Sequence, residues 1–98
     1  MNVQIQSVKF DADKKLVEFA QAKVEKLDRF IERATLAEVI LKIDKDNEAG
    51  NKVATIKLFV PGDELVAEAR SKSFEESVDM AVDALKKQIE KHKDKIKS

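Results

Sequence analysis

The spacing of the apolar residues changes along this 98-residue chain, and the order of those changes restricts the folds it can adopt. Val3 and Ile5 alternate with glutamines, which predicts a strand with one buried face. From Lys14 to about Arg33 the apolar residues instead recur every three or four positions, the spacing of a helix with one apolar stripe. Asp13 precedes this segment and is a suitable N-cap. The chain therefore opens with a strand followed by an amphipathic helix.

A second helix is predicted after a run of shorter elements. Alternating apolar residues predict three more strands, over residues 37–43, 54–60 and 65–69. The Pro61-Gly62 pair predicts a tight turn between the last two strands, because proline presets the first turn angle and glycine tolerates the second. Ser73 and Glu76 form a capping-box pattern at the start of a helix that continues nearly to the C-terminus. The predicted order is β-α-β-β-β-α.

This order predicts an α+β fold with a four-stranded sheet, similar to that of a double-stranded-RNA-binding domain. The first two strands are joined by a helix and are expected to be parallel, whereas the last three form a meander. Each helix has a single apolar stripe, so both are expected on the same face of the sheet. The length predicts one domain over residues 1–98. The core is expected to include Phe10, Phe59 and Phe74.

The charges cancel in number but are distributed by sign. There are 19 basic and 19 acidic residues. At about 100° per residue, the basic residues of the first helix form a band beside the apolar stripe, with Phe19 and Phe30 near it. In the second helix the acidic residues gather in the first half and the lysines in the second. Two adjacent bands would attract polyphosphate, although a solvated, charge-rich helix surface is the alternative interpretation. The bands comprise Lys15, Lys23, Lys26, Arg29 and Arg33 on the first helix, and Lys86, Lys87, Lys91, Lys93, Lys95 and Lys97 on the second.

Several kinds of chemistry find no support in the sequence. The chain has no cysteine, which excludes disulfides and thiolate chemistry. It has no glycine-rich phosphate loop and no serine beside an evident base. His92 is the only histidine, and no ligand spacing typical of a metal site surrounds it. We expect no enzyme activity, no cofactor, no metal and no small-molecule substrate.

The N-terminal residues and the apolar runs also bear on location. The first ten residues contain no signal-peptide pattern, and no apolar run is long enough to cross a bilayer. We therefore expect a cytoplasmic protein without a membrane partner.

Several short segments, in order and at the right spacing, resemble the ribosome hibernation promoting factor family over nearly the whole chain. They are Glu18-Phe19, Ala22-Lys23, Lys26-Leu27, Ile40-Leu41-Lys42 and the stretch Lys91 to Lys97. The resemblance implies a factor that binds 16S ribosomal RNA of the small subunit, in the channel for messenger and transfer RNA, and blocks translation in idle cells. It implies ribosomal RNA contacts by Lys23, Lys26, Arg29, Lys86, Lys87, Lys91, His92, Lys93 and Lys95.

The sequence also departs from the family pattern. Other members often carry an aspartate and a tyrosine where this chain has Ser73 to Glu76, so acidic residues here are expected to weaken one rim of the basic patch. The chain ends without the C-terminal dimerisation domain of long members, which predicts a short form that is monomeric off the ribosome. A different class of function stays open: a protein-interaction module that uses the uncovered sheet face, with lysines serving only solubility. Salt-dependent co-sedimentation with ribosomes distinguishes the two.

Overall fold

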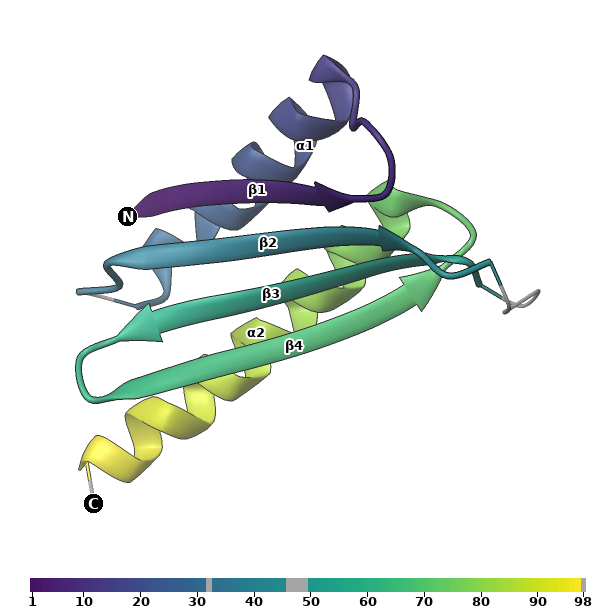
Figure 1. Ribbon diagram of the computed structural model, residues 1–98. Coiled ribbons are helices and arrows are strands. Elements are labelled where there is room, and N and C mark those ends of the chain that lie inside the picture. The colour runs from purple at the N-terminus through teal and green to yellow at the C-terminus, as the bar shows by residue number, and fades with distance from the viewer. Residues whose placement is uncertain (32, 46–49, 98) are drawn as a thin grey trace.

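The computed structural model describes residues 1–31, 33–45 and 50–97, with the side chains of 93–97 left undescribed. Figure 1 shows one sheet with two helices behind it. The elements are β1 (Asn2–Val8), α1 (Lys14–Glu25), the 3₁₀ helix η1 (Lys26–Arg29), β2 (Leu36–Ile43), β3 (Lys52–Val60), β4 (Asp63–Ser71) and α2 (Phe74–Lys97). The strand order is β1-β2-β3-β4, with β1 parallel to β2 and the other pairs antiparallel. The predicted α+β fold and its element order are confirmed.

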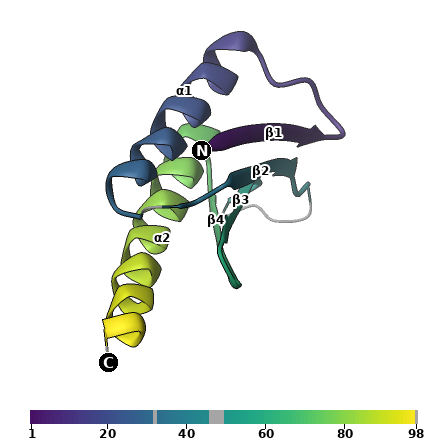
Figure 2. The same cartoon turned by 90° about the vertical axis from the view of Figure 1, so that its left-hand side faces the viewer.

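Both helices cover the same face of the sheet, as the side view in Figure 2 shows. The strand residues that point toward them are apolar, and Val39, Ile56 and Leu58 are at most 1% exposed. From the helix layer, Val24 and Leu85 close the core with no exposed surface. One buried stripe per helix is therefore enough to place both helices on one face.

The opposite sheet face is uncovered and partly apolar. Since strand side chains alternate between faces, Phe59 lies on the uncovered face, between the buried Leu58 and Val60. The expectation that Phe59 belongs to the core is wrong, because a one-residue step along β3 exchanges the two faces. Phe10 and Phe74 do reach the core, and their rings stack with centroids 4.9 Å apart.

Helix α1 begins as predicted but ends earlier. The Asp13 carboxylate accepts from the backbone N–H of Leu16 at 2.8 Å, which confirms the N-cap. The α-helix stops at Glu25 and continues as η1, so the expected helix to about Arg33 is wrong. A 3₁₀ segment turns more tightly, with about three residues per turn, which suits the end of a helix.

Two basic residues adopt a left-handed backbone in the connections between elements. Arg33 has a φ of 70° and lies beyond η1, so it cannot continue the basic band of α1. Lys9 follows β1 with a φ of 65°. Gly62, in the predicted Pro61-Gly62 turn, has a φ of 77°, which glycine adopts at little cost.

Hydroxyl groups fix the start of α2 to the sheet. The Ser73 hydroxyl accepts from the N–H of Glu76 at 3.2 Å, as the capping box predicts. The N–H of Ser73 donates instead to the Ser71 hydroxyl at 3.2 Å, so β4 supplies the other half of the cap. The buried Ser77 hydroxyl donates to the Lys52 carbonyl of β3 at 2.7 Å. In the described part of the chain, no helix is both long and apolar enough to span a membrane.

Truncating the buried stripe of α2 should destabilise the fold, whereas truncating its outer surface should not. We expect Leu85→Ala to lower the free energy of unfolding by about 2–5 kcal/mol, because Leu85 is 0% exposed and its removal leaves a cavity. The control is Met80→Ala on the same helix, where the side chain is 46% exposed and the change should stay within about 0.5 kcal/mol. Denaturant unfolding of both variants checks this, and equal losses would contradict the packing described.

Candidate nucleic-acid interface

The predicted site residues lie in the helix layer. We call the described basic residues among them the helix-side patch: Lys23, Lys26, Arg29, Lys86, Lys87 and Lys91. α1 supplies Lys23, and η1 supplies the exposed Lys26 and Arg29. The two helices are in contact, with Lys23 Nζ 2.9 Å from Asp79 Oδ1 of α2. The fold therefore brings the two basic bands onto one layer. Lys93 and Lys95 belong to the last turns of α2, and their side chains are outside the described part.

The lysines of α2 lie on two different sides of that helix. Lys86 points toward the end of η1, where its ammonium lies 5.2 Å from the centre of the Phe30 ring. Lys91 lies on the other side and, with Asp63 and Leu65 of β4, lines a shallow pocket of about 200 Å³. Lys87 is exposed between them. The helix-side patch thus extends around the outer surface of α2 from the α1 side to the β4 side.

Two members of the helix-side patch already have acidic partners. Lys23 pairs with Asp79, and Lys86 lies 3.9 Å from Asp83. The acidic first half of α2 is therefore packed beside the basic band of α1. The charge pattern of each helix taken separately does not reveal this contact. Such half-exposed pairs contribute little to stability, so a phosphate can compete for either lysine.

Aromatic rings support the same two lysines. The Phe19 ring lies 5.6 Å from Lys23 Nζ, and the Phe30 ring is 38% exposed beneath Lys86. This agrees with the expectation that both rings lie near the basic band. Each ring holds an ammonium group at a fixed place on the surface by cation–π attraction.

His92 lies where α2 crosses the β3–β4 turn. Its side chain is 17% exposed, and its Nδ1 lies 3.5 Å from Asp63 Oδ2. Nearby, the Gln88 amide donates to the Val66 carbonyl of β4 at 2.7 Å. Sequence reasoning missed Asp63 and Gln88, because nothing in the local pattern of either residue indicates a partner about twenty or more positions away. Within the described ranges, no three His, Asp or Glu side chains are grouped so that they could hold a metal ion.

The fold and this surface define a class of protein: a small α+β protein with a mixed four-stranded sheet on one side and a lysine-bearing helix layer on the other. The family model described as Sigma 54 modulation protein / S30EA ribosomal protein matches residues 3–97. The chain belongs to that family.

Named relatives agree with this assignment. The ribosome hibernation promoting factor of Klebsiella oxytoca is 34% identical over 80 residues, which are 82% of this chain and 80% of the relative. The protein of the same name from Escherichia coli K12 is 31% identical over 97 residues, which are 99% of this chain and 98% of the relative.

Solved structures show the same fold. A ribosomal subunit interface protein from Coxiella burnetii superposes with a TM-score of 0.83 at 22% identity, over 95% of this chain and 98% of that chain. The N-terminal domain of Thermus thermophilus Protein Y gives 0.81 at 22% identity, over 94% of this chain and 99% of that chain.

If the helix-side patch binds RNA phosphates, releasing Lys23 from the Asp79 carboxylate should strengthen that binding. We expect Asp79→Asn to raise the affinity for a labelled single-stranded RNA about two- to fivefold at low salt, since an exposed pair is worth up to about 1 kcal/mol. Fluorescence anisotropy measures it. The matched control is Glu18→Gln, which also removes one acidic partner, that of Lys14, but outside the helix-side patch. Equal affinities of the two variants would contradict a role for Lys23.

Proposed function

We propose that this protein is a ribosome hibernation factor that binds 16S ribosomal RNA of the small subunit in the channel for messenger and transfer RNA. Occupying that channel would block translation in idle cells. Family membership over residues 3–97 supports the ribosome as the partner. We propose that the protein contacts RNA phosphates, and the single structural observation behind this is the helix-side patch.

The helix-side patch suits a phosphate backbone better than a discrete ligand. Lys26, Arg29, Lys87 and Lys91 are exposed and carry no salt bridge among the described residues. Such exposed cations can neutralise phosphates along a nucleic-acid backbone, and the released counterions favour binding. Lys23 and Lys86 contribute once a phosphate replaces Asp79 and Asp83. We assign the remaining contacts to His92, Lys93 and Lys95.

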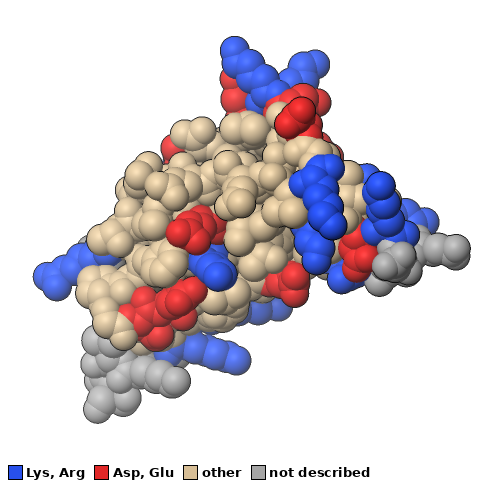
Figure 3. Space-filling model, viewed as in Figure 1, with Lys and Arg blue, Asp and Glu red and all other residues tan. Residues whose placement is uncertain are grey.

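A second candidate function rests on the uncovered sheet face. Figure 3 shows that much of this face carries neither acidic nor basic atoms. Its apolar side chains include Leu36, Ile40, Phe59 and Val66, and Val66 is 43% exposed. A protein partner could cover them, with the lysines then serving only solubility. We favour RNA docking over a protein partner because the fold gathers the basic residues of the helix-side patch into one layer.

Removing the lysine row of α2 should weaken binding in a salt-dependent manner. Each phosphate contact adds roughly 0.7–0.9 to the slope of log affinity against log salt concentration. The triple variant Lys87→Ala, Lys91→Ala, Lys95→Ala should therefore flatten that slope by about two to three units. Stability should change little, because alanine is a good helix former and exposed lysines contribute little. Co-sedimentation with purified small subunits across a salt series measures the slope.

The control for this variant is Lys14→Ala, since Lys14 lies outside the helix-side patch and pairs with Glu18. A folded triple variant that binds small subunits with unchanged affinity and slope would contradict RNA docking through α2. The interaction module on the uncovered sheet face would then be the leading candidate.

We further propose that residues 1–98 act as a single cytoplasmic ribosome-binding domain that is monomeric off the ribosome. Among the described residues, the exposed large apolar side chains are Phe30 just after η1, Val66 in β4 and Met80 in α2. Of these three, only Val66 lies on the uncovered sheet face, where the other apolar side chains, Leu36, Ile40 and Phe59, are partly buried. Light scattering at micromolar concentration should give the mass of one chain, 11.1 kDa. A stable dimer, for which the edges of β1 and β4 are the obvious route, would contradict this.

A further inference from the structure

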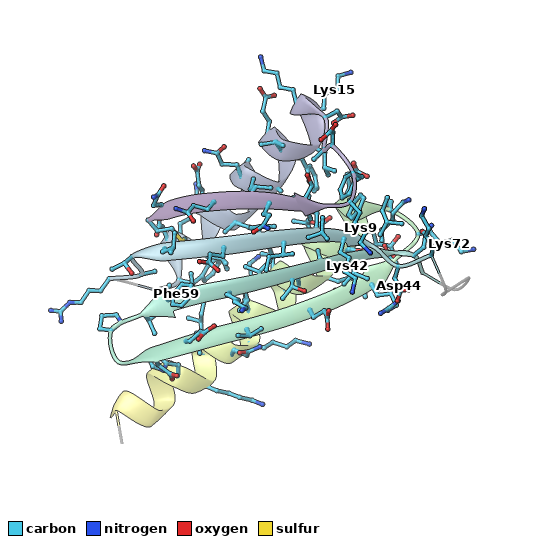
Figure 4. The ribbon with its side chains drawn as sticks, in the orientation of Figure 1. Lys9, Lys15, Lys42, Asp44, Phe59 and Lys72 are labelled. Atoms are coloured by element: carbon cyan, nitrogen blue, oxygen red, sulfur yellow. The ribbon has the colours of Figure 1, made fainter. Side chains whose placement is uncertain are left out.

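A second group of basic residues lies at the end of the sheet away from the C-terminus. We call it the sheet-end cluster, and it comprises Lys9, Lys42, Lys45, Lys52, Arg70 and Lys72. Figure 4 labels Lys9, Lys42 and Lys72 at this end, and Figure 3 shows the blue side chains gathered there beside the largely uncharged sheet face. None of these residues is a member of the helix-side patch.

Strand register explains why residues so far apart in the sequence meet here. Val8, Lys42, Val53 and Arg70 are successive register partners across all four strands. With strands about 4.8 Å apart, Lys42 and Arg70 lie within about 10 Å of each other on the uncovered face. Val53 between them is 3% exposed, although it lies on the uncovered face.

Residues at the ends of the strands complete the sheet-end cluster. Lys9 follows directly after β1, and Lys72 directly after β4. On the helix side, Lys52 Nζ lies 5.6 Å from the centre of the Phe74 ring. The basic groups therefore surround the end of the sheet on both of its faces.

Most of this positive charge is not neutralised by the described acidic groups. Arg70 is engaged, with its guanidinium 2.7 Å from Asp44 Oδ2 and donating to the Gly50 carbonyl at 3.3 Å. Lys9, Lys42 and Lys72, in contrast, have no salt bridge among the described residues. Arg70 therefore fixes the β2–β3 hairpin, while the three lysines are available to an anionic partner.

The sheet-end cluster is well separated from the lysines in the second half of α2. The α2 axis runs from Phe74, beside the sheet-end cluster, to Lys91 over about 25 Å, at 1.5 Å per residue. Acidic residues occupy the helix between these ends, including Asp79 and Asp83. A single phosphate group cannot contact both ends.

We propose that the sheet-end cluster is a second contact for RNA phosphates, so that the protein bridges two separate RNA segments. This inference rests on the proposed function, since the RNA is taken to be that of the small subunit. The contact with Lys42 comes from the uncovered sheet face, and the contact at the other end comes from α2. The molecule would then be held between the two segments along its longest dimension, 43 Å.

The first test measures salt slopes for binding to purified small subunits. The variant Lys42→Gln, Lys72→Gln should flatten the slope by roughly 1.4–1.8 units, because two phosphate contacts are lost. These two lysines are chosen because neither belongs to the segment 45–51, whose sequence also contains Asp46 and Glu48. The control Lys14→Gln, Lys57→Gln removes the same number of charges and should leave the slope unchanged. Lys57, like Lys42, lies on the uncovered sheet face. Adding Lys87→Ala and Lys91→Ala to this variant should flatten the slope further. The two reductions in slope should add, because the two groups of lysines are far apart.

The second test identifies the partner chemically. Because the chain has no cysteine, Lys72→Cys creates a single attachment point for a benzophenone photo-crosslinker. When the labelled protein is bound to small subunits and irradiated, it should become crosslinked to RNA. The label should remain attached to RNA after protease digestion. The same label at Lys91→Cys should reach a different RNA segment. The control places the label at Lys14→Cys, from which little crosslinking to RNA is expected.

The outcomes separate this inference from the proposed function. If the lysine row of α2 controls the slope but Lys42→Gln, Lys72→Gln does not, the second contact is wrong and the proposed function stands. If neither variant changes the slope, both are wrong. A crosslink from Lys72→Cys to ribosomal proteins only, or to the same RNA segment as Lys91→Cys, would overturn the bridging contact.

Discussion

Val78, Leu85 and Ile89 are buried along α2 between the sheet and α1, and their burial decides which side of every neighbouring residue faces solvent. With this stripe buried, Lys86 faces Phe30 at the end of η1, and Lys91 lines the pocket beside β4. The hydroxyl contacts of Ser77 then fix the position of α2 along its axis. The charge pattern that the proposed function requires is therefore a consequence of apolar packing, which holds both helices against one face of the sheet (Figures 1 and 2).

The parts of the fold that depend on local chemistry were predictable from the sequence. The Asp13 cap, the Pro61-Gly62 turn and the alternation in each strand all express preferences of a few adjacent residues. The early end of α1 was not predictable in this way, since η1 keeps Leu27 buried while changing the helical period. Phe59 was misplaced for another reason: in a strand, the step from one face to the other is a single residue.

The candidate site was predictable only as a set of basic residues on each helix separately. Pairs such as Lys23 with Asp79, or His92 with Asp63, join elements far apart in the sequence, and only the packed structure shows them. The sheet-end cluster was missed altogether. Its members come from strands and turns, where no helical period signals a shared surface, and strand register alone places Lys42 and Arg70 on either side of Val53. Long-range charge arrangement is thus the part of this protein that patterns within single elements reveal least.

Lys9 and Arg33 are the non-glycine residues with a left-handed backbone in the described part of the chain, and both are basic and exposed. A side chain in this region costs roughly 1–2 kcal/mol, and glycine would remove most of that cost. At each position, folding stability and positive surface charge therefore favour different residues. Glycine would remove the backbone strain, but it carries no positive charge. A version of this chain optimised only for thermal resistance would be expected to lose positive charge at these two turns. Its gain in stability would come with a weaker electrostatic attraction to any polyanion.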